Sequence, residues 1–372
     1  MEIVKGTYTS AKVFTDKMED HARAQIQLLC DNEAFSDCKV RVMPDVHPGK
    51  VGTIGFTATV GKMVLPNVVG IDIGCGILLA RLKQKQMEFQ KLDKVIRECI
   101  PSGFSVRKKP HRYAEEFDFT DLYCWRHVNQ RKAELSMGTL GGGNHFIEAD
   151  QAEDGGIYVA IHTGSRHLGK EVTEYYLREG QKELKERGLE VPYELTYLRG
   201  KLMEQYLHDT EVVQRFADLN REVILSELAK GMKWKIEQCS SCVHNYIDTS
   251  KEEKIIRKGA ISAHKGERVV IPVNMKDGIL LGEGLGNEDW NESAPHGAGR
   301  IRKREEVKAS YTVSQFKAEM KGIYCSCIGR ETLDEAPFAY RGLDEIREAV
   351  QETVRIQQIL KPIYNFKAGS EK

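Results

Sequence analysis

The chain lacks a long hydrophobic run, an excess of one charge and a regular cysteine framework. No uninterrupted apolar stretch approaches the roughly 18 residues that a membrane-spanning helix needs, so we expect no span. Lys and Arg together number 55, and so do Asp and Glu, which leaves no global basic field to attract nucleic acid. The N-terminal MEIVKGTYTSAKVF has no apolar run after its first charge, which predicts no signal peptide. The nine scattered cysteines are therefore expected to be reduced thiols in the cytoplasm.

Repeats and low-complexity segments are also missing, and the remaining pattern is mixed. Short β-branched or apolar runs bounded by Gly and Pro predict strands at CKVRVMPDV, GILLARL, GIYVAIHTGS, ERVVIPVNM, GILLGEG and GIYCSCIG. Helical spacing predicts helices over 87–100 and 343–360, and two or three long helices within 171–235, interrupted near 188–192. We expect an α+β fold with a mixed β core, surrounding helices and a helical excursion over about 171–235. Candidate ligands lie on both sides of that excursion, so residues 1–372 are predicted to be a single catalytic domain.

One stretch, from Met43 to Cys75, gathers reactive side chains among glycines and prolines. Asp45, His47, Asp72 and Cys75 lie there, in settings where side chains are presented rather than packed. A carboxylate and a thiolate three residues apart, as in IDIGC, can reach one metal ion or two neighbouring ones. This pair is the first sign of a metal site.

Imidazoles in similar surroundings follow downstream at His145, His162 and His244. Thiolate and imidazole favour Zn, Co, Fe or Mn, and the carboxylate suits harder ions such as Mn. Five mixed ligands exceed what one tetrahedral structural zinc takes, and a thiolate bridging two ions would use the surplus. Two ions can clamp phosphate oxygens on both sides of a displacement. For a single buried His or Cys a core role is the commoner explanation, but the whole set favours metal-assisted chemistry.

Other residues suit phosphate chemistry. His296 in SAPHGAGR follows Pro295 and precedes small residues, which suits an exposed nucleophile that forms a covalent phosphoramidate. Arg300 could pair with a phosphate, and Asn144, after three glycines, could bind a phosphate or orient the metal site. The sequence leaves open whether His296 is instead a further metal ligand or a loop histidine.

Three other patterns are weaker. GFTATVGKM has five residues between its glycines and Met63 in place of Ser or Thr, so we reject a P-loop. The pairs Cys239/Cys242 and Cys325/Cys327 could suggest a zinc knuckle, but core thiols are the preferred interpretation. The basic clusters 107–112 and RIRKR (300–304) are either solvated faces or local contacts for RNA.

Seven segments in a fixed order, from about residue 40 to the end, resemble the RtcB RNA ligases: PDVHPGK, VVGIDIGCG, GGGNHFIE, HTGSRHLG, HNYI, HGAGR and PIYNFKAG. The resemblance implies the α+β RtcB-type fold and a GTP- and Mn-dependent reaction. That reaction joins RNA 3′-phosphate or 2′,3′-cyclic phosphate ends to 5′-hydroxyl ends, through a guanylylated histidine and an RNA-ppG intermediate.

The same resemblance implies roles for individual residues. Cys75 would bridge two Mn²⁺ ions, with Asp72 and His145 on one ion and His162 and His244 on the other. His296 would be the guanylylated nucleophile, with Asp45 and Arg166 on further motif positions. The remaining contacts to phosphates and the guanine nucleotide would come from Asn144, Glu148, Gly297, Gly299, Arg300 and Lys367.

The chain departs from the family pattern in places. It is shorter than typical members, and VNMK (273–276) replaces a GSMG-like turn near the nucleotide pocket. His167 stands where glycine is more usual. These departures favour a divergent branch that repairs particular broken RNAs rather than splicing tRNA, and the expected partners are damaged ribosomal RNA and a release-factor homologue. Two alternatives remain: a metal-dependent cyclic phosphodiesterase that does not ligate, and a non-catalytic RNA-end sensor.

Overall fold

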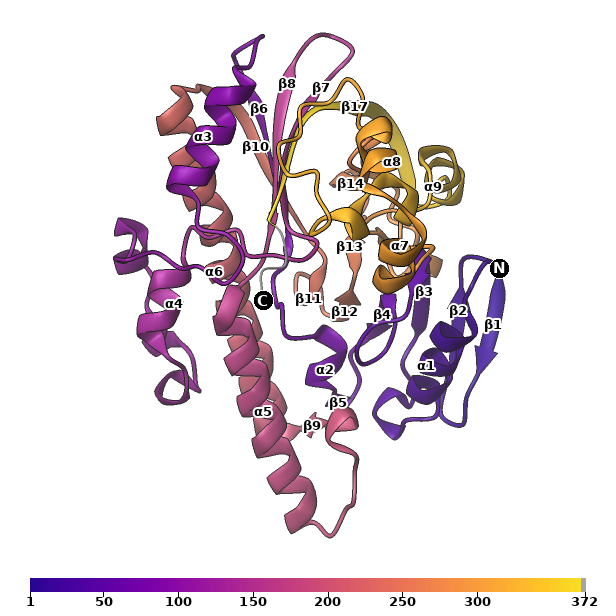
Figure 1. Ribbon diagram of the computed structural model, residues 1–372. Coiled ribbons are helices and arrows are strands. Elements are labelled where there is room, and N and C mark those ends of the chain that lie inside the picture. Colours follow the sequence, from indigo (N-terminus) through magenta and orange to yellow (C-terminus); the bar gives the residue numbers. More distant parts are fainter. Residues whose placement is uncertain (369–372) are drawn as a thin grey trace.

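Two β-sheets form the centre of the computed structural model, which describes residues 1–368 (Figure 1). The first sheet is mixed, because β2 and β3 run parallel while its other pairs are antiparallel. In spatial order its strands are β1 (Glu2–Lys5), β2 (Ser10–Val13), β3 (Val40–His47), β4 (Ile54–Thr59), β12 (Ile255–Lys258) and β11 (Asn245–Asp248). Helix α1 (Asp20–Cys30) makes the crossover between β2 and β3.

The second sheet is antiparallel throughout and carries most of the candidate ligands. In spatial order its strands are β10 (Ile236–Val243), β6 (Gly76–Leu82), β8 (Ile157–Thr163), β7 (Phe146–Gln151), β17 (Val354–Lys367), β15 (Gly278–Gly284) and β14 (Arg268–Asn274). All seven residues of β8 are buried, as its unbroken apolar run predicts for a strand covered on both faces. Two short ribbons complete the strands: β13 (Ala260–Ser262) with β16 (Ser293–Pro295), and β5 (Met63–Val64) with β9 (Leu198–Arg199).

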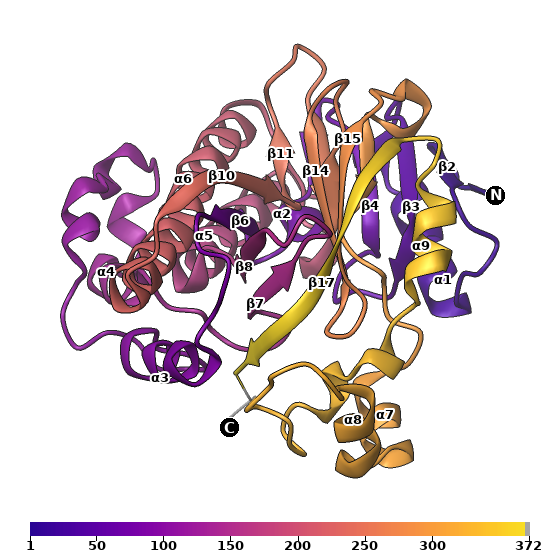
Figure 2. The same cartoon turned by 90° about the horizontal axis from the view of Figure 1, so that it is seen from above.

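Helices pack around both sheets. In the view of Figure 2, α3 to α6 gather on one side of the sheets, and α7 and α8 lie on another side, near the end of β17. Besides α1 the helices are α2 (Pro66–Val69), α3 (Phe89–Cys99), α4 (Gln130–Ser136), α5 (Arg166–Glu186), α6 (Gly200–Met232), α7 (Arg304–Ser310), α8 (Val313–Glu319) and α9 (Leu343–Ala349). No helix among residues 1–368 combines the length and apolar character that crossing a membrane requires.

The α+β prediction is confirmed, and the long helices are close to where the spacing placed them. Helix α5 ends just before the break expected near 188–192, and α6 runs on to Met232. Fourteen residues of α6 are buried, from Tyr206 to Met232, and nine of them belong to two core clusters, which explains how a 33-residue helix is held.

Two predicted elements are wrong. The helix over 343–360 stops at Ala349, and residues 354–367 form β17, which pairs with β15 and then with β7. Pro362 does not end this strand, because it lies at a register shift where a missing N–H is tolerated. The predicted strand GIYCSCIG is a loop whose only ladder contact is an isolated bridge between Tyr324 and Tyr364.

Candidate active site

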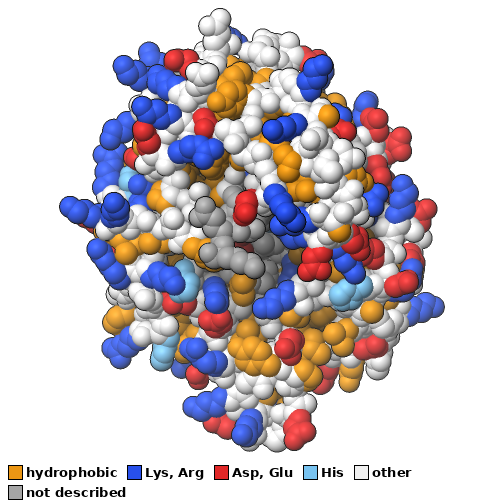
Figure 3. All heavy atoms as spheres, viewed as in Figure 1, with side chains coloured by type: hydrophobic (Ala, Val, Ile, Leu, Met, Phe, Trp, Pro, Cys, Tyr) orange, Lys and Arg blue, Asp and Glu red, His pale blue; other side chains and the backbone are white. Residues whose placement is uncertain are grey.

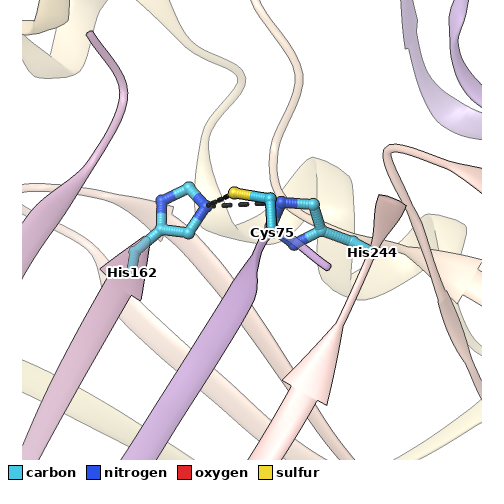
Figure 4. Close-up of side chains that lie close together, drawn as sticks. All are labelled: Cys75, His162 and His244. Atoms are coloured by element: carbon cyan, nitrogen blue, oxygen red, sulfur yellow. Dashed lines mark hydrogen bonds between the residues drawn. The ribbon is translucent and has the colours of Figure 1, made fainter. Parts of the chain in front are cut away.

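Four of the proposed metal ligands lie at the same end of four adjacent strands of the antiparallel sheet. Cys75 immediately precedes β6, His145 precedes β7, His162 is near the end of β8, and His244 follows β10. The register places Gly76 opposite Val243, and His162 opposite both Ile77 and Phe146. In an antiparallel sheet, one strand begins where its neighbour ends. Residues from distant parts of the sequence therefore meet at this end of the strands. Figure 4 shows Cys75, His162 and His244 turned toward one another.

The ligand atoms form two groups that share Cys75. In the first group, the Cys75 Sγ lies 3.4 Å from His162 Nε2, which lies 3.3 Å from His244 Nε2. In the second, the Cys75 Sγ lies 3.5 Å from His145 Nε2, which lies 3.1 Å from Asp72 Oδ2. All five predicted ligands are therefore brought together.

These separations fit metal coordination. Tetrahedral ligands bound to one ion at about 2.0–2.3 Å are about 3.3–3.8 Å from each other, which is close to the observed spacing. The ring orientations agree: His162 Nδ1 donates to the Asn144 carbonyl at 3.1 Å, and His145 Nδ1 donates to the Leu140 carbonyl at 2.9 Å. Each Nε2 is then left with a lone pair, and lone pairs that face one another need a cation between them.

The electrostatics also suit a cation. Burial lowers the pKa of His162 and of His244 well below the usual value, so both imidazoles are uncharged. Burial and the neighbouring Asp72 carboxylate raise the pKa of the Cys75 thiol. Burial would also raise the pKa of Asp72, but the contact with His145 and the charge of Arg166 outweigh it and hold that pKa at about 2. A bound cation would stabilise the Cys75 thiolate that this pocket otherwise disfavours.

Helix α6 supports the loops that carry these ligands. The fully buried Arg221 donates through Nη1 to the carbonyls of Gly74 (2.8 Å) and Thr163 (2.6 Å), each adjacent to a proposed ligand. The neighbouring Asn220 bonds to the backbone at 138–139 and at Gly164. The helical excursion thus holds the metal site together.

His296 follows β16 and lies beside the metal cluster. Its ring centroid is 4.8 Å from that of His244, and its Nδ1 lies 2.8 Å from Oδ2 of the fully buried Asp45 on β3. Asp45 accepts a hydrogen bond from the Nδ1–H group, which leaves the lone pair of the ring on Nε2. Gly299 permits this contact between segments: its φ is +71°, and a Cβ there would lie 2.4 Å from the Asp45 carbonyl oxygen.

A cavity of about 280 Å³ opens next to His296. It is lined by every residue that the resemblance assigned to the nucleotide: Asn144, Glu148, His296, Gly297, Gly299, Arg300 and Lys367. His162 and His244 line the same cavity, so it meets the metal cluster. Val273, Asn274 and Met275, from the segment that departs from the family pattern, form part of its wall.

One end of the cavity carries positive charge over a buried carboxylate. Arg300 Nη2 donates to Glu335 Oε1 at 2.6 Å, and Lys367 Nζ lies 2.7 Å from Glu335 Oε2. The charges of Lys367, Arg304 and Arg300 outweigh burial and hold the pKa of Glu335 well below its usual range. Arg300 Nη1 is buried without a partner among the described residues, so it is available to an anion such as a phosphate.

Sequence reasoning missed several residues of this region. His47 was noticed but given no role; it lines the cavity, and burial lowers its pKa to about 4. Glu335 ends a short 3₁₀ helix and Tyr340 follows another, in a region without a recognisable sequence pattern, and Arg221 is one charged residue of an amphipathic helix. The only signal for Arg221 in the sequence was its position on the otherwise mainly apolar face of α6.

A second cleft lies beside the described end of β17. Arg107, Lys108 and Lys109, one of the basic clusters of the sequence, line it together with Lys308 and Arg330. Lys367 lines both this cleft and the cavity next to His296. Figure 3 shows Lys and Arg side chains spread over this face of the molecule.

The two cysteine pairs once considered for a zinc knuckle lie on separate elements. Cys239 and Cys242 are on β10, whereas Cys325 and Cys327 lie in the loop after α8. The rejected P-loop segment runs through β4 and β5. The last residue of the PIYNFKAG segment, Gly369, lies outside the described residues.

The chain is similar to known proteins over most of its length. The family model described as "tRNA-splicing ligase RtcB" matches residues 32–123 and 119–368. The RNA-splicing ligase RtcB of Escherichia coli K12 is 28% identical over 402 aligned residues, which cover 97% of this chain and 98% of that protein. The tRNA-splicing ligase RtcB of Nanoarchaeum equitans is 29% identical, with 84% of each chain covered.

Proposed function

This chain belongs to the RtcB family of RNA ligases, and from that premise we propose that it joins RNA 3′-phosphate or 2′,3′-cyclic phosphate ends to 5′-hydroxyl ends with GTP and Mn²⁺. The observation that carries the proposal is the position of His296. Its Nδ1 is hydrogen-bonded to the buried Asp45, and its ring lies between the cluster of proposed metal ligands and a cavity in which Arg300 Nη1 has no partner among residues 1–368.

Metal dependence is supported by the two ligand groups that share Cys75. We assign Asp72, Cys75 and His145 to one Mn²⁺ and Cys75, His162 and His244 to the other. When bound, the two ions would neutralise charge on the phosphate oxygens around the displacement. Carboxylate and imidazole ligands suit Mn²⁺, although the same donor set also accepts Zn²⁺, so the metal needs a direct test.

The chain's own residues would act in three steps. His296 Nε2 attacks the α-phosphate of GTP while Asp45 holds the Nδ1 proton, so that GMP becomes bonded to His296 and diphosphate leaves. The RNA 3′-phosphate then takes the GMP, which gives an RNA-ppG end. The 5′-hydroxyl attacks this end and GMP leaves; a cyclic phosphate must first be hydrolysed. Arg300 Nη1 and Lys367 are placed to bind phosphate oxygens, and Asn144 and Glu148 to contact the nucleotide.

The RNA strand would approach along the second cleft. Arg107, Lys108 and Lys109 line it, and Lys367 connects it to the cavity beside His296. Each phosphate contact that is removed should reduce the salt dependence of RNA binding by about one unit of slope. The Lys108→Ala, Lys109→Ala double variant should show this reduction, whereas a Lys182→Ala, Lys185→Ala control on α5 should not.

The natural RNA would be a broken tRNA or ribosomal RNA, and a release-factor homologue could act beside the enzyme. Cleaved RNAs of both kinds serve as test substrates.

The decisive experiment is intact-protein mass after incubation with GTP and Mn²⁺. The parent chain should gain one GMP, and His296→Ala should gain none. His208→Ala is the matched control, because His208 is a partly exposed histidine on α6 that pairs with Asp121. If the parent gains no GMP and no AMP in a parallel incubation with ATP, the proposal fails. In that case a variant His296→Ala that still opens cyclic phosphates would identify a metal-dependent phosphodiesterase, and RNA binding without turnover would identify an RNA-end sensor.

A further inference from the structure

The loop after α8 holds two thiols in contact. The sulfur atoms of Cys325 and Cys327 lie 3.2 Å apart, and both side chains are half-buried. Ser326 between them is fixed to α3, since its hydroxyl donates to Asp93 and accepts a hydrogen bond from Arg97. Cys327 lines the second cleft, where small molecules from solvent can reach it.

The two thiols have unequal surroundings. The hydrogen bond from Cys325 lowers the pKa of Cys327, and the backbone N–H and charge of Lys367 lower it further, outweighing burial. The same hydrogen bond, together with burial, raises the pKa of Cys325. The Lys367 N–H donates to the Cys327 sulfur at 3.2 Å. One sulfur with thiolate character next to a protonated one is the arrangement of dithiols that undergo exchange.

We propose that Cys325 and Cys327 form a reversible intramolecular disulfide, and that this disulfide lowers nucleotide use in the neighbouring cavity through Lys367. The sulfur atoms need to approach by about 1.2 Å, from 3.2 Å to the roughly 2.05 Å of an S–S bond. The loop contains Gly322 and Gly329, at either of which a Cβ would meet nothing within 4 Å, so the backbone around it is not tightly enclosed.

The oxidant is a low-molecular-weight disulfide such as oxidised glutathione. The Cys327 thiolate attacks one glutathione sulfur, which forms a mixed disulfide and releases one glutathione thiolate. Cys325 then loses its proton to solvent and attacks the Cys327 sulfur, which releases the second glutathione. Two cysteines are oxidised by two electrons, and one glutathione disulfide is reduced to two thiols.

The link to the cavity is Lys367, and this part of the inference rests on the proposed function. The backbone N–H of Lys367 is bonded to the Cys327 sulfur, while its Nζ pairs with Glu335 inside the cavity. A disulfide sulfur accepts a hydrogen bond less well than a thiolate and would be drawn toward Cys325. We expect the loss of this one hydrogen bond to lower the affinity for GTP about fivefold.

The first test is peptide mass after oxidation of the full Mn-loaded chain. Trypsin releases Gly322–Arg330 (GIYCSCIGR), whose only cysteines are this pair. After oxidised glutathione and then alkylation, the parent peptide should be unalkylated and two hydrogens lighter, and dithiothreitol should reverse this change. Cys325→Ser should instead carry glutathione on Cys327. A doubly alkylated parent peptide, recovered while the exposed Cys239 already carries glutathione, would overturn the proposal.

The second test is GTP affinity in both redox states. The oxidised parent should bind GTP about fivefold more weakly than the reduced parent, while the Cys325→Ser, Cys327→Ser double variant should not respond to the oxidant. An equal loss in the double variant would place the effect on another thiol, such as Cys75, and would overturn the coupling, as would an unchanged parent. If even the reduced chain does not bind GTP, the proposed function fails, while the peptide masses still decide whether the disulfide forms.

Discussion

Replacing Asp45 with Asn tests how the proposed nucleophile is activated. The Asp45 side chain is fully buried, and its Oδ2 lies 2.8 Å from His296 Nδ1. As Nε2 bonds to phosphorus, His296 gains positive charge, which the carboxylate stabilises and an amide does not. A hydrogen bond to a charged group contributes about 1.5–3 kcal/mol, so its loss alone should slow the step about 10- to 150-fold.

The same substitution also changes which ring nitrogen carries the proton. An asparagine that turns its NH₂ toward Nδ1 holds the proton on Nε2, and the lone pair needed for attack is lost. In a Ser-His-Asp hydrolase the corresponding Asp→Asn change costs about 10⁴-fold. We therefore expect Asp45→Asn to slow GMP transfer to His296 by about 10²- to 10⁴-fold.

The assay is the single-turnover rate of GMP adduct formation, followed by intact mass at saturating Mn²⁺. Asp45 belongs to neither metal-ligand group, so elemental analysis should find the same Mn content in variant and parent. An equal melting temperature would exclude a folding defect. An adduct rate within threefold of the parent, with the metal content unchanged, would refute the role of Asp45 in activating His296.

Four further predictions concern the surroundings of the nucleophile. Cys75→Ala should lower Mn from two ions per chain to less than one, measured by elemental analysis; a normal content would exclude a bridging thiolate. Arg221→Lys keeps the charge but loses one of the two bonds to the ligand-bearing loops, so metal titration should show a dissociation constant about 10- to 100-fold higher. Asn144→Ala should lower the ligation rate by about 10- to 100-fold without a change in melting temperature, and an unchanged rate would remove Asn144 from the site. Burial raises the pKa of Asp150, which lies beside Glu148, so the folded state keeps a proton that the unfolded chain loses near pH 4, and stability falls as the pH rises above that value. Asp150→Asn should therefore raise the melting temperature by several degrees at about pH 8 and by little at about pH 4, and equal shifts at both pH values would contradict this.

The grouping of the proposed metal ligands was predictable because short motifs place them at strand ends. GIYVAIHTGS is an unbroken apolar run that delivers His162 at its end, and IDIGCG places Cys75 just before β6. The sequence could not show that Arg221 ties both loops together, because a contact between α6 and two strand ends depends on tertiary packing. Glu335 is similarly invisible, since only the folded chain brings it to Lys367.

The prediction for the C-terminal region was wrong for a physical reason. Residues 343–349 have helical spacing and do form α9, but the β-branched and alternating residues that follow fit a strand equally well over a short window. The available partners decided the outcome, because β15 and β7 leave a position between them that only an extended segment can fill. Pro362 indicated an end to regular structure but marks a shift in register.

The spread of the site along the chain has a consequence for its synthesis. The first proposed ligand, Asp72, and the proposed nucleophile, His296, are separated by 224 positions, and β17, which completes the central sheet, comes later still. A chain leaving the ribosome therefore exposes Asp72 and Cys75 long before His244 exists. Contacts so distant in sequence form late in folding, and a site absent from the unfolded chain binds metal only once they have formed. Metal uptake by this protein would thus report that synthesis and folding are complete, and truncated chains would remain unloaded.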